Sequence, residues 1–169
     1  VTGDIRASQV TAGRVQSIAA GRNIVSSSLA ISGQVSSITA GSQISSTTIE
    51  ITGPDGSLSN LQAASLISGS ISASGPIGTI TVASGDLVGS LVTTTPRGNV
   101  GTLRAGRDID LATDISGNIA SLSAGRSFGV AGRKRAMLVR VDLASATATS
   151  GQLYNDIRVG GQITGAVNV

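Results

Sequence analysis

The chain repeats one short phrase, Gly-x-aliphatic-x-x-Ile/Leu, along most of its length. Six clear copies begin at Gly13, Gly33, Gly56, Gly75, Gly98 and Gly117. Successive copies are 20, 23, 19, 23 and 19 residues apart, and a looser copy begins at Gly151. A fixed period near 20 residues is typical of solenoids, in which each repeat buries its apolar side against its neighbours. The repeat therefore predicts a stacked architecture.

A second phrase, Ala-Gly-x-x-Ile/Phe, follows many copies of the first, at residues 20–24, 40–44, 105–109 and 124–128. Helices are disfavoured, because Gly recurs every few residues and Ser, Thr, Val and Ile fill the gaps. Aliphatic residues two apart, such as Ile18 and Ala20, lie on one face of a short strand. Glycines stand where corners need an unusual backbone or close approach. One repeat is thus predicted to be a closed turn of about three short strands with aliphatic side chains inside.

Such turns bury their interior by stacking, because each strand pairs in parallel with its equivalent about 4.8 Å away. The sequence predicts an all-β fold, a single-stranded parallel β-helix (β-solenoid) of about eight coils of 19–23 residues, with residues 1–169 as one domain. A right-handed coil is expected from the general preference for right-handed crossovers. The predicted core stack consists of Val15, Ile18, Ala20, Ile24, Val35, Ile38, Ala40, Ile44, Val100, Leu103, Ala105, Ile109, Ile119, Leu122 and Ala124.

Composition narrows the function classes. The chain has one Phe, one Tyr and no Trp, so the core must be packed from small aliphatic residues. Twelve Lys and Arg against nine Asp and Glu give a net charge of only +3, which makes a nucleic-acid partner unlikely. The lack of Cys excludes disulfides and thiolate sites, and no stretch of 18 apolar residues predicts a membrane span. A first residue other than Met predicts a mature product or an excised piece.

The regular spacing of the repeats is interrupted once, between Gly117 and Gly151. A basic loop insertion is predicted there, at about residues 129–137. Its residues Arg133, Lys134 and Arg135 are a candidate contact for an anionic polymer, and a merely solvated insertion is the alternative. The following stretch, residues 137–143, alternates as a half-buried strand does, with Val141 among the inward-facing residues.

Cleavage of polysaccharides needs clustered carboxylates, sometimes with Arg, Lys or His as the base, and this chain has no His and a single Glu, Glu50. The one dense acidic group is Asp108, Asp110 and Asp114. Asp108 and Asp110 are two residues apart, which would place them together on the outer face of a strand as an acid pair or a Ca²⁺ site. The alternative is a set of solvated carboxylates beside arginines. No residue pattern indicates a cofactor.

The phrases A-G-R-[DN]-I and G-N-[IV]-x-[ST]-L-x-A-G resemble the repeats of bacterial surface β-helix proteins, namely filamentous-haemagglutinin-like adhesins and autotransporter passenger domains. The resemblance extends from about Gly3 to Val169. It implies a non-enzymatic, secreted or cell-surface bacterial module. Its partners would be itself or flanking repeats end to end, and an extracellular polysaccharide or host surface.

Two alternatives stay open: a carbohydrate-active β-helix enzyme of the polysaccharide lyase or hydrolase kind, and a glycan- or ice-binding surface. Ice binding would need Thr-rich ladders on successive coils. The Ser/Thr runs at residues 45–48 and 93–95 do not recur at one phase of the repeat, which argues against it.

Overall fold

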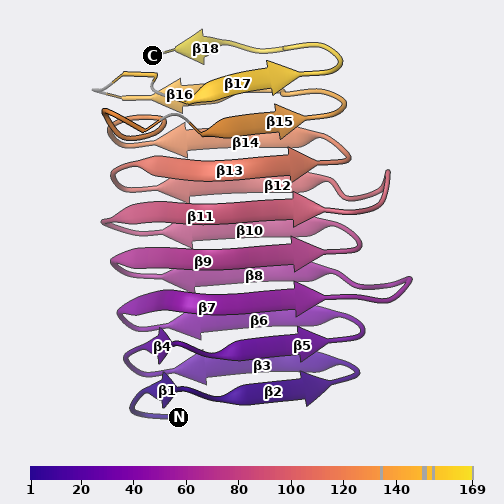
Figure 1. Cartoon of the computed structure of the whole chain (residues 1–169), viewed down its shortest axis with the longest axis vertical. Helices are drawn as coiled ribbons and strands as arrows, with labels where there is room; N and C mark the ends of the chain where they lie inside the picture. The colour runs from indigo at the N-terminus through magenta and orange to yellow at the C-terminus, as the bar shows by residue number, and fades with distance from the viewer. Residues whose placement is uncertain (134, 150–151, 154, 169) are drawn as a thin grey trace.

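The computed structural model describes residues 1–133, 135–149, 152–153 and 155–168. Within these residues the chain forms strands and no helix, and the strands build two parallel sheets that face each other (Figure 1). The fold is therefore a β-solenoid, as predicted. The described part of the chain contains no helix that is long and apolar enough to cross a bilayer.

The two sheets differ in strand length. The eight-stranded sheet consists of β3 (Val15–Ala20), β6 (Val35–Ala40), β8 (Leu58–Ala63), β10 (Ile77–Val82), β12 (Val100–Ala105), β14 (Ile119–Ala124), β16 (Ala146–Ala148) and β18 (Val167–Asn168). The ten-stranded sheet consists of β1 (Ile5–Arg6), β2 (Gln9–Ala12), β4 (Ile24–Val25), β5 (Ser28–Ile31), β7 (Gln43–Ile51), β9 (Leu66–Ala73), β11 (Asp86–Thr93), β13 (Ile109–Ile115), β15 (Ala136–Val139) and β17 (Asp156–Val159).

Each coil contributes equivalent residues in register to the stack. One such row runs through Val15, Val35, Leu58, Ile77, Val100, Ile119, Leu143 and Ile163, one residue per coil. In Figure 1 the near strands of the ten-stranded sheet run to the right and the far strands run back to the left as the chain climbs. This sense makes the solenoid right-handed, as expected.

The prediction of three strands per coil holds only near the N-terminus. There β3, β4 and β5 make one coil. Ser26 lies between β4 and β5 with a φ of 51°, and this left-handed backbone separates the two strands. From β7 upward the second and third strands merge into one, so these coils have two strands. The break persists in β7 as a register shift between Ile44 and Thr47, next to Ser46 with a φ of 50°.

The core is an aliphatic stack between the two sheets. Of the predicted stack residues, all are buried except Val15 and Ile18, which are half-buried because β3 pairs with a single strand, β6, among the described residues. Ile18 pairs with Ile38 and Ala20 pairs with Ala40, as the repeat predicts. The glycine after Ala40 is required by close stacking, since a Cβ on Gly41 would lie 2.1 Å from the carbonyl oxygen of Gly21.

Two predictions near the C-terminus are wrong: the extent of one strand and the start of one repeat. The strand predicted over residues 137–143 ends at Val139, and Val141 lies exposed in a bend before Leu143 rejoins the core. The copy predicted to begin at Gly151, which lies outside the described residues, does not start a new repeat at Leu153. Leu153 bridges Phe128, and Phe128 bridges Ile109, so Leu153 occupies the Ile/Phe position of the second phrase.

Candidate functional site

The three predicted acidic residues lie in or next to β13, but Asp108 and Asp110 do not form the exposed pair that was predicted. Asp108 precedes the strand, and its side chain is almost fully buried. Asp110 has no exposed side-chain surface, whereas Asp114 is 44% exposed. The expectation that Asp108 and Asp110 share an exposed face is therefore wrong, because other parts of the chain cover both carboxylates.

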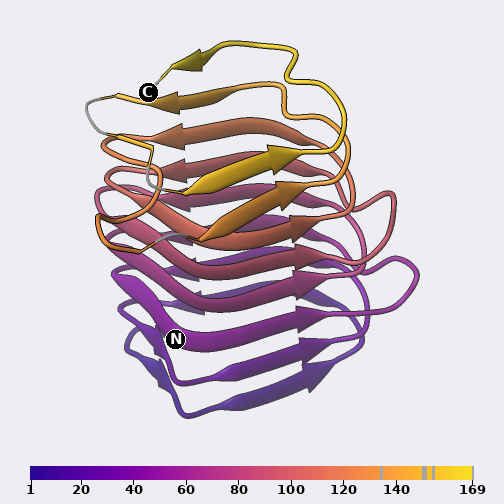
Figure 2. The ribbon, with the colours of Figure 1, turned by 45° about the horizontal axis from the view of Figure 1, so that its top comes forward.

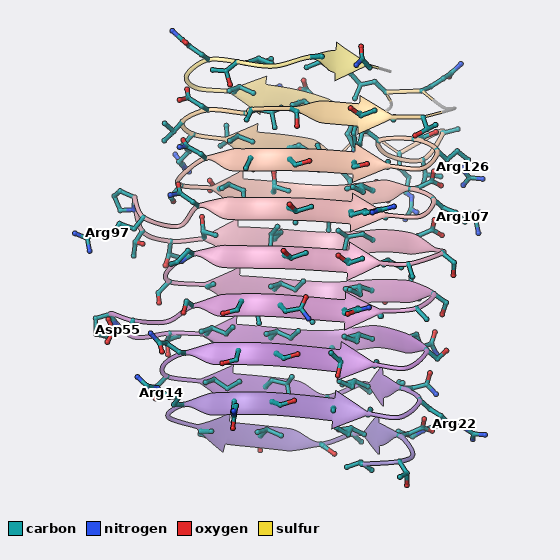
Figure 3. The ribbon with its side chains drawn as sticks, turned by 180° about the vertical axis from the view of Figure 1, so that it is seen from behind. Arg14, Arg22, Asp55, Arg97, Arg107 and Arg126 are labelled. Carbon is teal, nitrogen blue, oxygen red and sulfur yellow. The ribbon has the colours of Figure 1, made fainter. Side chains whose placement is uncertain are left out.

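Asp108 is held by the coil above it. Arg126 donates a hydrogen bond from Nε to Asp108 Oδ1 at 2.8 Å and also contacts Oδ2 through its second nitrogen. The backbone N–H of Ser127 donates to the same Oδ1 at 3.1 Å. Bonding to Arg126 lowers the pKa of the Asp108 carboxyl, against the opposing effect of burial. Asp108 thus separates Arg107 and Arg126, which project from neighbouring coils along one edge in Figure 3.

Asp114 is also committed to a neighbouring coil. Arg140 donates from Nε and Nη2 to the two carboxylate oxygens, both at 2.7 Å. This bidentate pair raises the pKa of the Arg140 guanidinium. Asp108 and Asp114 are therefore each bound by an arginine, and the described residues contain no group of three or more His, Cys, Asp or Glu that could hold a metal ion.

Asp110 is covered by the predicted basic loop. We call residues 129–133 and 135 the basic strap. It lies between β14 and β15 and curls beside the ten-stranded sheet in Figure 2. Arg133 and Arg135 approach Asp110 Oδ2 at 3.3 and 3.1 Å, and Arg135 Nη1 donates to the Gly89 carbonyl at 3.3 Å. The candidate polyanion contact thus faces a carboxylate of its own chain, while its third member, Lys134, lies outside the described residues.

The Asp110 contact is an ion pair without well-aligned hydrogen bonds. Neither Asp110 oxygen nor Arg135 Nε has a hydrogen-bond partner of good geometry, although all three atoms are buried. The strap therefore compensates the buried charge of Asp110 by proximity.

A row of hydrogen bonds between side chains and backbone, which we call a polar ladder, connects successive coils at one corner and was not predicted from the sequence. Its side chains each accept a hydrogen bond from the backbone N–H of the equivalent residue one coil higher. Asp4 accepts from Asn23 at 3.0 Å, Asp86 from Asp108 at 3.1 Å, and Ser127 from Gln152 at 3.2 Å. Among the A-G-R-[DN]-I phrases, Asp108 supplies such an acceptor, to the backbone N–H of Ser127, whereas Asn23 donates from Nδ2 to Asp4.

The corner preceding the eight-stranded sheet carries a second ladder. Asn99 Oδ1 accepts from the N–H of Asn118 at 2.9 Å, Asn118 Oδ1 from Asp142 at 3.1 Å, and Asp142 Oδ1 from Gln162 at 2.7 Å. The Asn of the G-N-[IV] phrase supplies the first two acceptors. Both ladders satisfy backbone donors where the chain turns between the sheets, and the second explains why Asn recurs in the G-N-[IV] phrase.

The outer face of the eight-stranded sheet presents hydroxyl groups at a fixed phase, which the Ser/Thr runs did not reveal. One row passes through Ser17, Ser37, Asn60, Thr79, Thr102 and Ser121. The parallel row passes through Ala19, Thr39, Gln62, Thr81, Arg104 and Ser123. An amide side chain interrupts each row and Arg104 also interrupts the second, so the surface is polar and mixed.

A cleft lies between two projecting loops. Residues 52–57 and 94–99 extend from the same corner, as the two protrusions at the right of Figure 1 show. Their sequences, TGPDGS and TTPRGN, share a Pro, a following charged residue and a Gly. The hollow that we call the loop cleft has a volume of about 360 Å³, and Gly75 and Pro76 of the short corner between the loops contribute to its lining. A smaller hollow of about 220 Å³ includes Glu50.

Comparison with known proteins supplies no family for these features. The chain matches no protein-family model, no curated protein and no solved structure.

Proposed function

We propose that this chain is a rigid, non-enzymatic structural module of an extracellular bacterial fibre, adhesin or surface protein. The observation that carries the proposal is the unbroken, in-register stack from Val15 to Ile163, in which each coil is hydrogen-bonded to the next. Such a stack favours a stiff rod, because each repeat is supported mainly by its neighbours.

The end coils support continuation of the rod. β1, β2 and β3 at one end and β17 and β18 at the other each pair with one strand among the described residues. Four large aliphatic side chains of the end coils are exposed, namely Val1, Leu153, Ile163 and Val167. Open strand edges flanked by apolar residues template further pairing. We infer that another coil covers them, from a second copy or from flanking repeats.

The state of the acidic residues supports a structural role over the enzymatic alternative. A general acid and base need carboxylates that reach substrate, whereas Asp108, Asp110 and Asp114 are paired with arginines. A screen on pectins, alginates and glycosaminoglycans, read by ultraviolet absorbance of unsaturated products, is expected to show no turnover. Turnover lost on Asp108→Asn with Asp110→Asn would establish the enzyme instead.

End-to-end association is tested by charging one end. Ile163→Lys puts a cation on the last coil, where Ile163 is 52% exposed, and is expected to prevent association without unfolding the chain. Ser123→Lys, on an inner coil, is the matched control. Sedimentation velocity and electron microscopy over a concentration series should show filaments for the unmodified chain and the control. Equal behaviour of all three proteins would contradict the stacking proposal.

A further inference from the structure

We propose that the loop cleft binds an uncharged saccharide segment. The inference concerns one corner of the solenoid and does not depend on end-to-end stacking. It rests on the position of the two loops, on their internal hydrogen bonds and on the chemistry of the side chains that line the hollow. The volume of about 360 Å³ lies at the lower end of the range for small-ligand pockets.

The repeat itself shapes the cleft. Gln34, Ser57, Pro76 and Asn99 each precede the first residue of a strand in four successive coils, so they form one row along the rod axis. The loops carrying Pro54 and Arg97 are two coils apart, which corresponds to about 10 Å. The short corner at Gly75 leaves the space between them open. The result is a trough along the rod that suits an extended ligand.

Both loops are fixed before any ligand arrives. Ser74, in the intervening coil, donates from Oγ to the Gly53 carbonyl at 2.5 Å, and its own carbonyl accepts from Thr95 Oγ1. The buried Thr93 hydroxyl donates to the Gly98 carbonyl at 2.7 Å. Gly98 has no room for a side chain, since a Cβ would lie 2.5 Å from Thr93 Cβ. Such preorganisation reduces the entropy lost on binding.

The lining offers donors and acceptors that the protein does not use. Within the described residues, the side chains of Gln34, Asp55, Ser57 and Arg97 make no hydrogen bond or ion pair. Asp55 and Arg97 project to the same side of the solenoid in Figure 3. One carboxylate and one guanidinium, with amides and hydroxyls between them, match a ligand whose groups both donate and accept.

Sugar hydroxyls have this dual character, and the cleft's charges select against ionic ligands. A polyanion would meet Asp55, and a basic peptide would meet Arg97, without an excess of opposite charge in the lining. The rings of Pro54 and Pro76 add apolar surface that can cover the C–H face of a pyranose. The combination points to a neutral saccharide rather than to a uronate polymer or a peptide.

The experiment is an NMR titration of the ¹⁵N-labelled chain with maltotetraose, cellotetraose and mannotetraose, and separately with tetragalacturonate and tetralysine. At least one neutral tetrasaccharide is expected to shift the backbone amides of Gln34, Ser57 and Asn99, with a dissociation constant of about 1 mM or below. Asp55→Asn with Arg97→Gln is expected to weaken binding about tenfold or more. Arg14→Gln, at the same edge but outside the cleft, is the matched control (Figure 3).

The shifts in the unmodified chain locate the site even if a variant folds poorly, and melting curves show whether it does. The proposal is overturned if no neutral tetrasaccharide shifts these amides at about 10 mM. It is also overturned if tetragalacturonate or tetralysine binds more tightly, or if Arg14→Gln weakens binding as much as the cleft variant. Ile163→Lys leaves the cleft intact, so failure of stacking and failure of saccharide binding are separate outcomes.

Discussion

Asp108 links the stability of the solenoid to pH. Its carboxyl pKa is lowered, chiefly by Arg126, from about 3.9 in an unfolded chain. The stabilisation is therefore complete above about pH 4 and is lost as the pH falls through the lower pKa of the folded state. Asp108→Asn is expected to lower the free energy of unfolding by about 1 to 2 kcal/mol at neutral pH, because Arg126 is half exposed. Urea denaturation at pH 7 and pH 2.5 should show this difference shrinking in acid; a constant difference would contradict the assignment.

Ala40 tests how tightly the core is packed. It is 6% exposed and pairs with Ala20 below and Ala63 above. Ala40→Leu is expected to destabilise the fold by about 1 to 3 kcal/mol, because three extra carbon atoms have no space between coils. Thermal unfolding measures the effect, with the exposed Ser36→Ala as a control of little consequence. An unchanged melting temperature for Ala40→Leu would show that the core has room here.

Residue-level prediction succeeds for the core and fails for Asp110, for one physical reason. The alternation of β13 gives the face on which Asp110 lies, since Ile109 and Leu111 are buried on the other face. Alternation cannot show that Arg133 and Arg135, more than twenty residues later, fold back over that face. Burial by a distant segment depends on tertiary structure, so a local pattern assigns the carboxylate to solvent.

The basic strap is the element whose energetics are least obvious. Removing only the cation leaves Asp110 buried without full compensation, so Arg135→Leu is expected to cost about 3 to 5 kcal/mol. The double variant Asp110→Leu with Arg135→Leu is expected to recover most of that loss, because it also removes the buried charge. Denaturant unfolding of both single variants and the double variant forms the required cycle. Additive losses would show that the two side chains are not coupled.

Element boundaries were predictable where the glycine phrases are regular and not where they lapse. The phrases place the coils from β3 to β14 correctly, since each Gly-x-aliphatic begins a strand of the eight-stranded sheet. Beyond β14 the equivalent row passes through Leu143, which has Val141 where the phrase has Gly. Gly151 therefore led to the wrong repeat assignment, in which Leu153 was placed in the first phrase and not in the second. The loop cleft could not be foreseen, because it arises from two insertions two coils apart.

At the scale of the molecule, local stability is expected to fall toward both ends. Inner strands such as β8 and β10 have neighbours on both sides, whereas β3 and β18 have one neighbour each in the part of the chain that the structure describes. Hydrogen exchange measured by mass spectrometry on the monomeric chain is therefore expected to be slowest in β8 to β12 and fastest in the end coils. Uniform exchange along the rod would instead indicate one all-or-none unfolding unit.

The stacked architecture follows from the repeat and its right-handed sense from the general preference of crossovers, while the irregular additions follow from neither. Stacking of equivalent residues requires only the period and the aliphatic positions, which are visible in the letters. The side chains that form the two polar ladders are also visible in the sequence. Their hydrogen-bond partners are not, because these depend on how neighbouring corners stack.

Two side-chain bonds of the upper coils have a mechanical consequence. Arg135 bonds to the Gly89 carbonyl and Asn155 Nδ2 to the Ile109 carbonyl at 3.3 Å, and each bond joins residues 46 positions apart, so it skips a coil. Tension applied between the chain ends peels a solenoid one coil at a time, releasing about 70 Å of contour length per 20 residues. Where a bond reaches past the adjacent coil, two coils must give way together. Optical-tweezer traces are therefore expected to contain a double-length rip of about 140 Å at higher force.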